Sequence, residues 1–193
     1  MQAMRFFWRT PVLFILLGTI WGSSFLAIDV GLQVAPPLTF AAFRYLLAGV
    51  LLVGYSAYGM GRWLPQSRRA MTEIAIIAVF LIAAYHALLY TGQMTVAAPV
   101  AAVLVNLSPI FTAIIAVLWM GHRYEPAAMA GFVVGLIGVG IVAISPGVGL
   151  RIDGVGMLLI IGAGLSFAIG SLLTSVRTDD TPLTTIHGWG MLV

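Results

Sequence analysis

The chain has 193 residues, of which 61% are hydrophobic and 8% charged, and its mean hydropathy is +1.09. Soluble domains contain roughly 25% charged residues, so this composition excludes a water-exposed surface of ordinary polarity and indicates an integral membrane protein. All nine basic residues are Arg. They fall in the gaps between apolar runs and form no basic patch, which argues against a nucleic-acid partner. The lack of Cys excludes disulfides and thiolate metal sites.

Six apolar runs reach the length of about 20 residues that a membrane-spanning helix needs. None alternates in the way that strands of a membrane β-barrel do. The predicted fold is therefore all-α, an integral membrane bundle of several spans in a lipid bilayer. The runs cover residues 12–32, 38–58, 74–92, 96–119, 127–145 and 155–176, and a seventh opens near Pro182 and is cut off at Val193.

The distribution of Arg predicts how the chain crosses the membrane. If the chain crosses at each run, four segments lie on the same side of the membrane: residues 1–10, the gaps after runs two and four, and the end of run six. Each of these segments contains Arg. The opposite side offers only Arg151 and Arg44. Because cytoplasmic loops are enriched in Lys and Arg, we expect a multi-pass protein of the cell membrane with a cytoplasmic N-terminus, residues 1–10. The first run is too long for the core of a signal peptide and is predicted to be a retained span.

A short repeat suggests two structural units. Pro37-Leu38-Thr39 returns as Pro182-Leu183-Thr184. Five spans separate the two copies, an odd number, so the units would be inverted relative to each other, as in transporters whose sites lie near the midplane. The predicted units are residues 11–146, with spans one to five, and residues 147–193, with span six and part of span seven; a chance match is the alternative.

The fourth run is interrupted by the polar sequence NLSPIFTAII, residues 106–115. Pro109 has no N–H and leaves the carbonyl of Val105 without its helical partner. In a membrane such an acceptor must face protein, water or a side-chain donor. Two interpretations remain open here: a kinked structural helix, or a notch in which Asn106, Ser108 and Pro109 line a central cavity.

The third run carries a polar stripe, since His86, Tyr90 and Gln93 stand at i, i+4 and i+7, with Tyr85 beside them. Intramembrane polar groups usually face the bundle interior and mark pathways, which favours a cavity. Interhelical hydrogen bonding alone is the structural alternative. No metal site is predicted, because His86 has no second ligand at suitable spacing on its helix.

The first two runs carry further candidates. Trp21 and Ser24 lie near the middle of run one, where Trp21 is expected to pack inside the bundle or gate a path. Asp29 and Arg44 lie a few residues inside the ends of consecutive spans. Because an unpaired charge there is costly, we expect a structural charge pair; a proton or substrate site is the alternative.

These stretches, taken in order, resemble an EamA-type member of the drug/metabolite transporter superfamily. The carrying sequences are WGSSFLAI, PPLTFAAFRYLLAG, ALLYTGQMTVAAPVAAVLVNLSPIFTAIIAVLWMG and the glycine-rich GFVVGLIGVGIV, and the resemblance covers residues 12–176. One departure is His122, which stands where the family usually has Glu. The resemblance implies a ten-span fold when complete, built from two inverted five-helix repeats around a central cavity, and candidate cavity residues at Trp21, Ser24, Tyr85, His86, Tyr90, Asn106, Ser108 and Pro109.

The implied function is a secondary transporter of small metabolites or amino acids that works by alternating access, as an exporter in our leading hypothesis. It needs no cofactor, and a coupling proton or ion is an open partner. Enzymatic activity is not expected, because Asp29 is the one acid inside a span and Ser108 has no evident base in its own segment. The short length predicts a fragment; the alternatives are a half-transporter that completes its cavity as a homodimer, or a membrane protein that does not transport.

Overall fold

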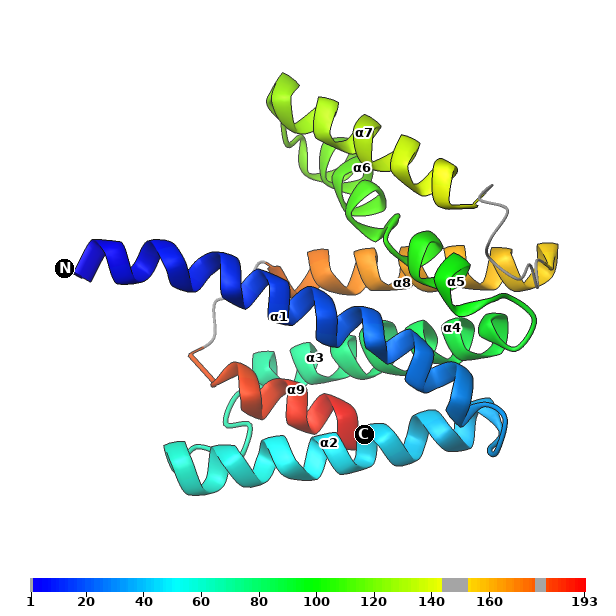
Figure 1. Ribbon diagram of the computed structural model, residues 1–193. Coiled ribbons are helices and arrows are strands. Elements are labelled where there is room, and N and C mark those ends of the chain that lie inside the picture. The colour runs from blue at the N-terminus through cyan, green and yellow to red at the C-terminus, as the bar shows by residue number, and fades with distance from the viewer. Residues whose placement is uncertain (1, 144–152, 176–179) are drawn as a thin grey trace.

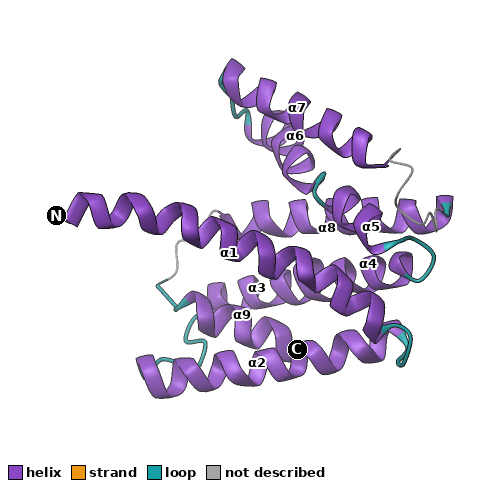
Figure 2. Ribbon diagram, viewed as in Figure 1, coloured by secondary structure: helices purple, strands orange, loops and turns teal. Residues whose placement is uncertain are grey.

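The computed structural model describes residues 2–143, 153–175 and 180–193, and this part of the chain is entirely helical (Figures 1 and 2). Five helical segments are long and apolar enough to cross a membrane: Pro11–Gly31, Pro37–Met60, Arg68–Gln93, Ala98–Met120 and Gly154–Ser175. The prediction of an all-α multi-span membrane bundle is therefore confirmed.

The elements follow the predicted runs, with two of the spans subdivided. The third span joins two α-helices through a π-helix, and the fourth is interrupted at Asn106 and Leu107. The elements are α1 (Gln2–Gly31), α2 (Pro37–Met60), α3 (Arg68–Ile76), η1 (Ile77–Ala84), α4 (Tyr85–Gln93), α5 (Ala98–Val105), α6 (Ser108–Met120), α7 (Pro126–Ala143), α8 (Gly154–Ser175) and α9 (Leu183–Leu192).

Local sequence sets several helix ends. Pro37 opens α2, where its missing N–H is not needed. The Ser67 side chain caps α3 by accepting a 2.9 Å hydrogen bond from the backbone N–H of Ala70. Gly61 and Gly121 end α2 and α6 in the left-handed conformation, with φ of 63° and 64°, which glycine adopts without a steric penalty.

Helix α8 packs closely on α4 and η1 because glycines remove the side chains between them. A Cβ atom built on Gly92 would lie 2.6 Å from the backbone oxygen of Gly156, and one built on Gly170 would collide with Leu81. The start of α8 therefore meets the end of α4, and the end of α8 meets η1. The two segments run antiparallel, and Figure 1 shows them side by side in the centre of the bundle.

Helix α9 lies along α2, also antiparallel (Figure 1). Ser56 Oγ donates a 2.6 Å hydrogen bond to Thr184 Oγ1 near the end of α2 and the start of α9. Further along, a Cβ atom on Gly49 would lie 3.0 Å from the carbonyl oxygen of Gly188 and 2.8 Å from the side chain of Leu192. The helices that begin with the two copies of Pro-Leu-Thr are thus direct neighbours.

Candidate functional site

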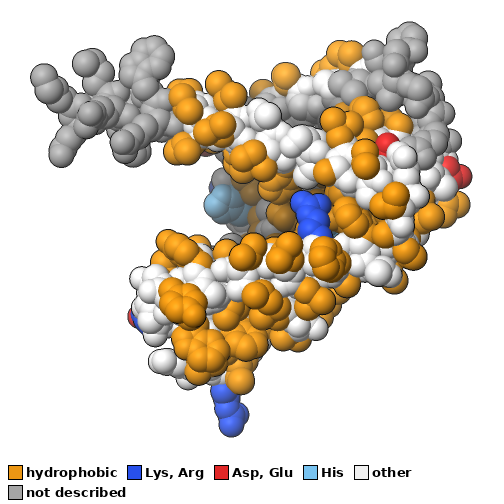
Figure 3. All heavy atoms as spheres, turned by 60° about the horizontal axis from the view of Figure 1, so that its bottom comes forward, with side chains coloured by type: hydrophobic (Ala, Val, Ile, Leu, Met, Phe, Trp, Pro, Cys, Tyr) orange, Lys and Arg blue, Asp and Glu red, His pale blue; other side chains and the backbone are white. Residues whose placement is uncertain are grey.

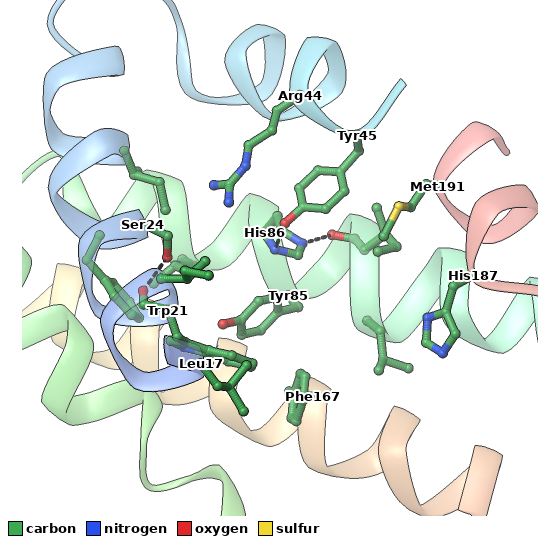
Figure 4. A pocket seen from close by; sticks show the side chains of 16 residues that line it. Leu17, Trp21, Ser24, Arg44, Tyr45, Tyr85, His86, Phe167, His187 and Met191 are labelled. Atoms are coloured by element: carbon green, nitrogen blue, oxygen red, sulfur yellow. Dashed lines mark hydrogen bonds between the residues drawn. The ribbon is translucent and has the colours of Figure 1, made fainter. Parts of the chain in front are cut away.

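A cavity of about 340 Å³ lies between α1, α2, the η1–α4 segment, α8 and α9. Figure 3 shows the molecule hollowed on this side, with hydrophobic side chains around the rim and basic and histidine side chains inside. Figure 4 shows the lining from close by. Its polar and aromatic members are Trp21, Ser24, Phe25, Arg44, Tyr45, Tyr85, His86, Phe167 and His187.

The His86 side chain is held between its own helix and α2. Its Nδ1 lies 2.9 Å from the carbonyl oxygen of Ile82, and its Nε2 contacts the hydroxyl of Tyr45. Since a carbonyl only accepts, this pattern assigns the proton to Nδ1, so that Nε2 accepts from the Tyr45 hydroxyl. The ring edge of His86 also packs against Tyr85, with centroids 4.3 Å apart. The imidazole is therefore fixed in one orientation at the cavity wall.

Arg44 reaches from α2 into the cavity (Figure 4). Its Nη1 donates a 2.8 Å hydrogen bond to the hydroxyl of Tyr90, a side chain that is completely buried. The guanidinium carbon lies 5.8 Å from the centroid of the Tyr45 ring, within the range of a cation–π contact. Tyr90 does not line the cavity itself; it holds the residue that does.

Gln93 is also completely buried and lies outside the cavity lining. Its Nε2 donates a 2.7 Å hydrogen bond to the backbone oxygen of Phe25 in α1. The predicted stripe on α4 therefore forms one face with three targets: His86 and Tyr90 bind side chains of α2, and Gln93 fastens α4 to α1.

Trp21 and Ser24, the two predicted cavity residues on α1, both line the cavity. Ser24 Oγ donates a 2.6 Å hydrogen bond to the carbonyl oxygen of Trp21, one turn earlier on the same helix. The Trp21 ring makes an edge contact with Phe167 of α8, with centroids 6.5 Å apart. Phe167 in turn lies 5.4 Å from the ring of Tyr85. These three aromatic rings form a continuous wall that joins α1, α8 and α4.

The polar break in the fourth span is present, but the structure does not bring its residues to this cavity. Asn106 and Pro109 are exposed, and neither they nor Ser108 belong to its lining. Asn106 Nδ2 donates a 2.6 Å hydrogen bond to Ala102 O, and Thr112 Oγ1 donates one of 2.8 Å to Ser108 O. The side chains at the break satisfy carbonyls of their own segment, which is the arrangement of a kinked structural helix.

The carbonyl that Pro109 leaves free faces protein. A Cβ atom built on Gly164 of α8 would lie 3.5 Å from the oxygen of Val105, an ordinary contact distance. The oxygen of Val105 therefore lies against α8. That is a tolerated position for a free acceptor at membrane depth.

The two charged candidates are placed differently. Arg44 lines the cavity and binds Tyr90, whereas Asp29 is half-buried on α1 and outside the cavity lining. The charge pair between them stays a prediction. Among the described residues, no group of three or more His, Cys, Asp or Glu side chains lies together as a metal site would require.

Sequence reasoning missed two polar residues of the cavity, Tyr45 and His187. Tyr45 follows Arg44 inside a span-length apolar run, so the rule that singled out His86 applies to it equally. His187 lies in the final apolar segment, which is too short to be scored as a span. In both cases the signal was a polar side chain within an apolar stretch.

A multi-span helical bundle with polar side chains around a cavity between its helices is typical of membrane transport proteins. The sequence pattern of the EamA-like transporter family matches residues 8–144. The chain belongs to this family.

Relatives among curated proteins agree with the family. The inner membrane transporter YedA of Escherichia coli is 31% identical over 81% of this chain and 50% of its own length. A WAT1-related chloroplastic protein of Arabidopsis thaliana is 26% identical over 90% of this chain and 42% of its own. A probable terminal-alkyne amino-acid exporter of Streptantibioticus cattleyicolor is 31% identical over 66% of this chain and 42% of its own.

The chain spans about half the length of the curated relatives it matches. No solved structure shows significant similarity to it. Because the family and the relatives are transporters, the chain is a multi-pass membrane protein of a transporter family and not of a family of enzymes.

Proposed function

We propose that the protein is a secondary transporter that exports small metabolites or amino acids by alternating access through the cavity described above. The observation that carries this proposal is that both predicted repeats contribute to one cavity. Residues from α1, α2, η1 and α4 line one part of it, and residues from α8 and α9, Phe167, His187 and Met191, line the rest. Transporters with inverted repeats bind solute where the repeats meet. The relative named as an amino-acid exporter supports the direction and the solute class.

The packing of α2 on α9 supports two inverted units, residues 11–146 and 147–193. Each helix begins at a copy of Pro-Leu-Thr, and the two run antiparallel in direct contact. Equivalent helices related by a two-fold axis in the membrane plane have this arrangement. Rocking of one unit against the other then opens the cavity to either side, driven by a coupling proton or ion.

We further propose that the N-terminus and the loop of residues 61–67 are cytoplasmic in the cell membrane. Arg62 lies in this loop, and Arg68 and Arg69 follow it at the start of α3. The positive-inside rule counts Arg and Lys near the ends of spans, so these three Arg support a cytoplasmic location for this end of the molecule.

The absence of native Cys makes single-cysteine labelling a direct test. Ser24→Cys places a thiol in the cavity, and Leu118→Cys places one on α6, where the side chain is 81% exposed on a surface that the bilayer would cover. A membrane-impermeant maleimide is applied to intact cells and to inside-out vesicles. We expect the thiol at position 24 to react from both sides and the thiol at position 118 to react from neither. A thiol at position 24 that reacts from one side only, or from none, contradicts alternating access.

Two further variants in the same experiment test the orientation. Val34→Cys places a thiol in the connection between α1 and α2, where the Val34 side chain is 85% exposed. Gln66→Cys places one in the 61–67 loop. In intact cells the thiol at position 34 is expected to react and that at position 66 to be protected. Labelled amino acids loaded into proteoliposomes with the protein measure the flux itself.

A further inference from the structure

The charge balance of the cavity indicates which kind of solute it takes. Arg44 gives the lining a fixed positive charge, and none of the described residues that line the cavity is Asp or Glu. The acidic side chains visible in Figure 3 lie away from the hollow. A charge at membrane depth is expensive unless an opposite charge compensates for it. The lining is therefore electrostatically suited to an anion.

The guanidinium of Arg44 is positioned to bind that anion. Among the described residues, Arg44 contacts two uncharged groups, the Tyr90 hydroxyl at 2.8 Å and the Tyr45 ring. A guanidinium has five N–H donors, and the bond to Tyr90 uses one of them. The planar fork of Arg matches a carboxylate with two parallel hydrogen bonds. The buried Tyr90 orients the side chain and leaves donors for a ligand.

The remaining lining suits an apolar body attached to the charge. Trp21, Phe167 and Tyr85 form the aromatic wall, and the other lining residues are mainly aliphatic. Cavities of a few hundred Å³ with apolar walls and few polar groups are typical of small-molecule sites, and this one measures about 340 Å³. One fixed charge beside an apolar wall fits a solute with a single charged end.

Building on the proposed transport function, we propose that the cavity binds an organic monoanion, a monocarboxylate with a compact apolar or aromatic body, and that Arg44 holds its carboxylate. This role competes with the predicted charge pair. If Asp29 neutralised Arg44, the cavity would have no charge preference and would favour a neutral or zwitterionic solute. The charge preference of the cavity therefore decides between the two roles of Arg44.

Protection of a cavity thiol from a maleimide measures binding independently of transport. In the Ser24→Cys protein, three carboxylates (benzoate, phenylacetate and hexanoate) are compared with the matching amides (benzamide, phenylacetamide and hexanamide). We expect at least one carboxylate to protect at roughly tenfold lower concentration than its amide, because charge-assisted bidentate bonds are about twice as strong as neutral ones. Arg44→Gln is expected to abolish this preference, and Arg44→Lys to weaken it several-fold, because Lys keeps the charge and loses the fork.

The matched control is Arg62→Gln, which removes the same charge from an exposed position in the 61–67 loop and should leave the preference unchanged. If Arg44→Gln fails to fold, the Arg44→Lys variant still tests the role of the fork. Equal protection by every carboxylate and its amide overturns the proposal, as does an undiminished preference in folded Arg44→Gln. Anion-selective protection without flux of any labelled carboxylate or amino acid would contradict the transport function alone. Flux without anion preference would contradict the solute class alone.

Discussion

Two polar stretches lie at membrane depth in this chain, and they differ in where their hydrogen bonds go. On α4, the side chains of His86, Tyr90 and Gln93 contact groups 41 to 68 residues away in the sequence, on α2 and α1. At the junction of α5 and α6, Asn106 and Thr112 donate to carbonyls four residues earlier in their own segment. The α4 stripe connects neighbouring helices around the cavity, whereas the side chains at the α5–α6 junction form hydrogen bonds within their own segment.

The difference shows that spacing carries more information than polarity. Groups at i, i+4 and i+7 lie on one face, and that face must find partners on other helices. The polar groups around Pro109 are instead close in sequence to the carbonyls that the break disturbs. Both stretches are equally unusual in an apolar run, but only the stripe on α4 predicts contacts with other helices.

The largest expected effect comes from Gly92, which sets the distance between α8 and the polar stripe on α4. In Gly92→Ala, the added Cβ would lie 2.6 Å from the backbone oxygen of Gly156 and 2.7 Å from Ile160, so the helices must separate. Overpacking of this kind destabilises by about 1–3 kcal/mol. We expect a clear fall in the thermal unfolding midpoint of the purified protein in detergent.

The matched control is Gly164→Ala, where α8 faces the junction of α5 and α6. The new Cβ would lie 3.5 Å from its nearest neighbours, Phe111 and Val105 O, which is ordinary contact. Ala is also a better helix former than Gly by about 1 kcal/mol, so this variant should unfold at an unchanged or higher temperature. Equal destabilisation by both substitutions would show that the two regions do not differ in packing.

The sequence predicted the spans well because a bilayer imposes length and apolarity on each one. The break before Pro109 and the common face of His86, Tyr90 and Gln93 are also local properties, and both are present. The partners of that face were not predictable in the same way. The bond from Arg44 to Tyr90 depends on how α2 approaches α4, and no local pattern specifies this approach.

The π-helix η1 also escaped prediction. Its sequence, IAVFLIAA, is uniformly apolar and carries no sign of a changed hydrogen-bond register. Both α8 and α9 pack against it. On α8, Ser166 Oγ donates a 2.8 Å hydrogen bond to the backbone oxygen of Phe80, and Gly170 admits the side chain of Leu81. A residue 86 positions away thus supports this π-helix, and π-helical irregularities inside α-helices are frequent at functional sites.

An intermediate effect is expected when the α4 stripe loses its bond to α1. Gln93→Leu keeps the approximate volume of a fully buried side chain and removes the 2.7 Å bond from Nε2 to Phe25 O. Interhelical bonds between polar side chains in membranes contribute about 0.6 kcal/mol on average and about 1.7 kcal/mol at most. We expect the free energy of unfolding, measured at equilibrium, to fall by an amount within this range. The control is Gln66→Leu in the 61–67 loop, where the side chain is exposed and the substitution should leave stability unchanged. A gain in stability would mean that burial of the amide outweighs its bond to α1.

The smallest effect is expected at the junction, from Asn106→Leu. The side chain is exposed and its one described bond returns to Ala102 O in the same segment. Once the protein is in a bilayer, leucine at such a position loses a local bond and gains contact with lipid, so the change in unfolding free energy should stay within about 0.5 kcal/mol. Solute flux should also remain at the level of the unmodified protein, because Asn106 lies outside the cavity. Loss of flux with normal folding would place Asn106 on the solute path in another conformation of the transport cycle, and the contrast between the two stretches would then hold only for the conformation described.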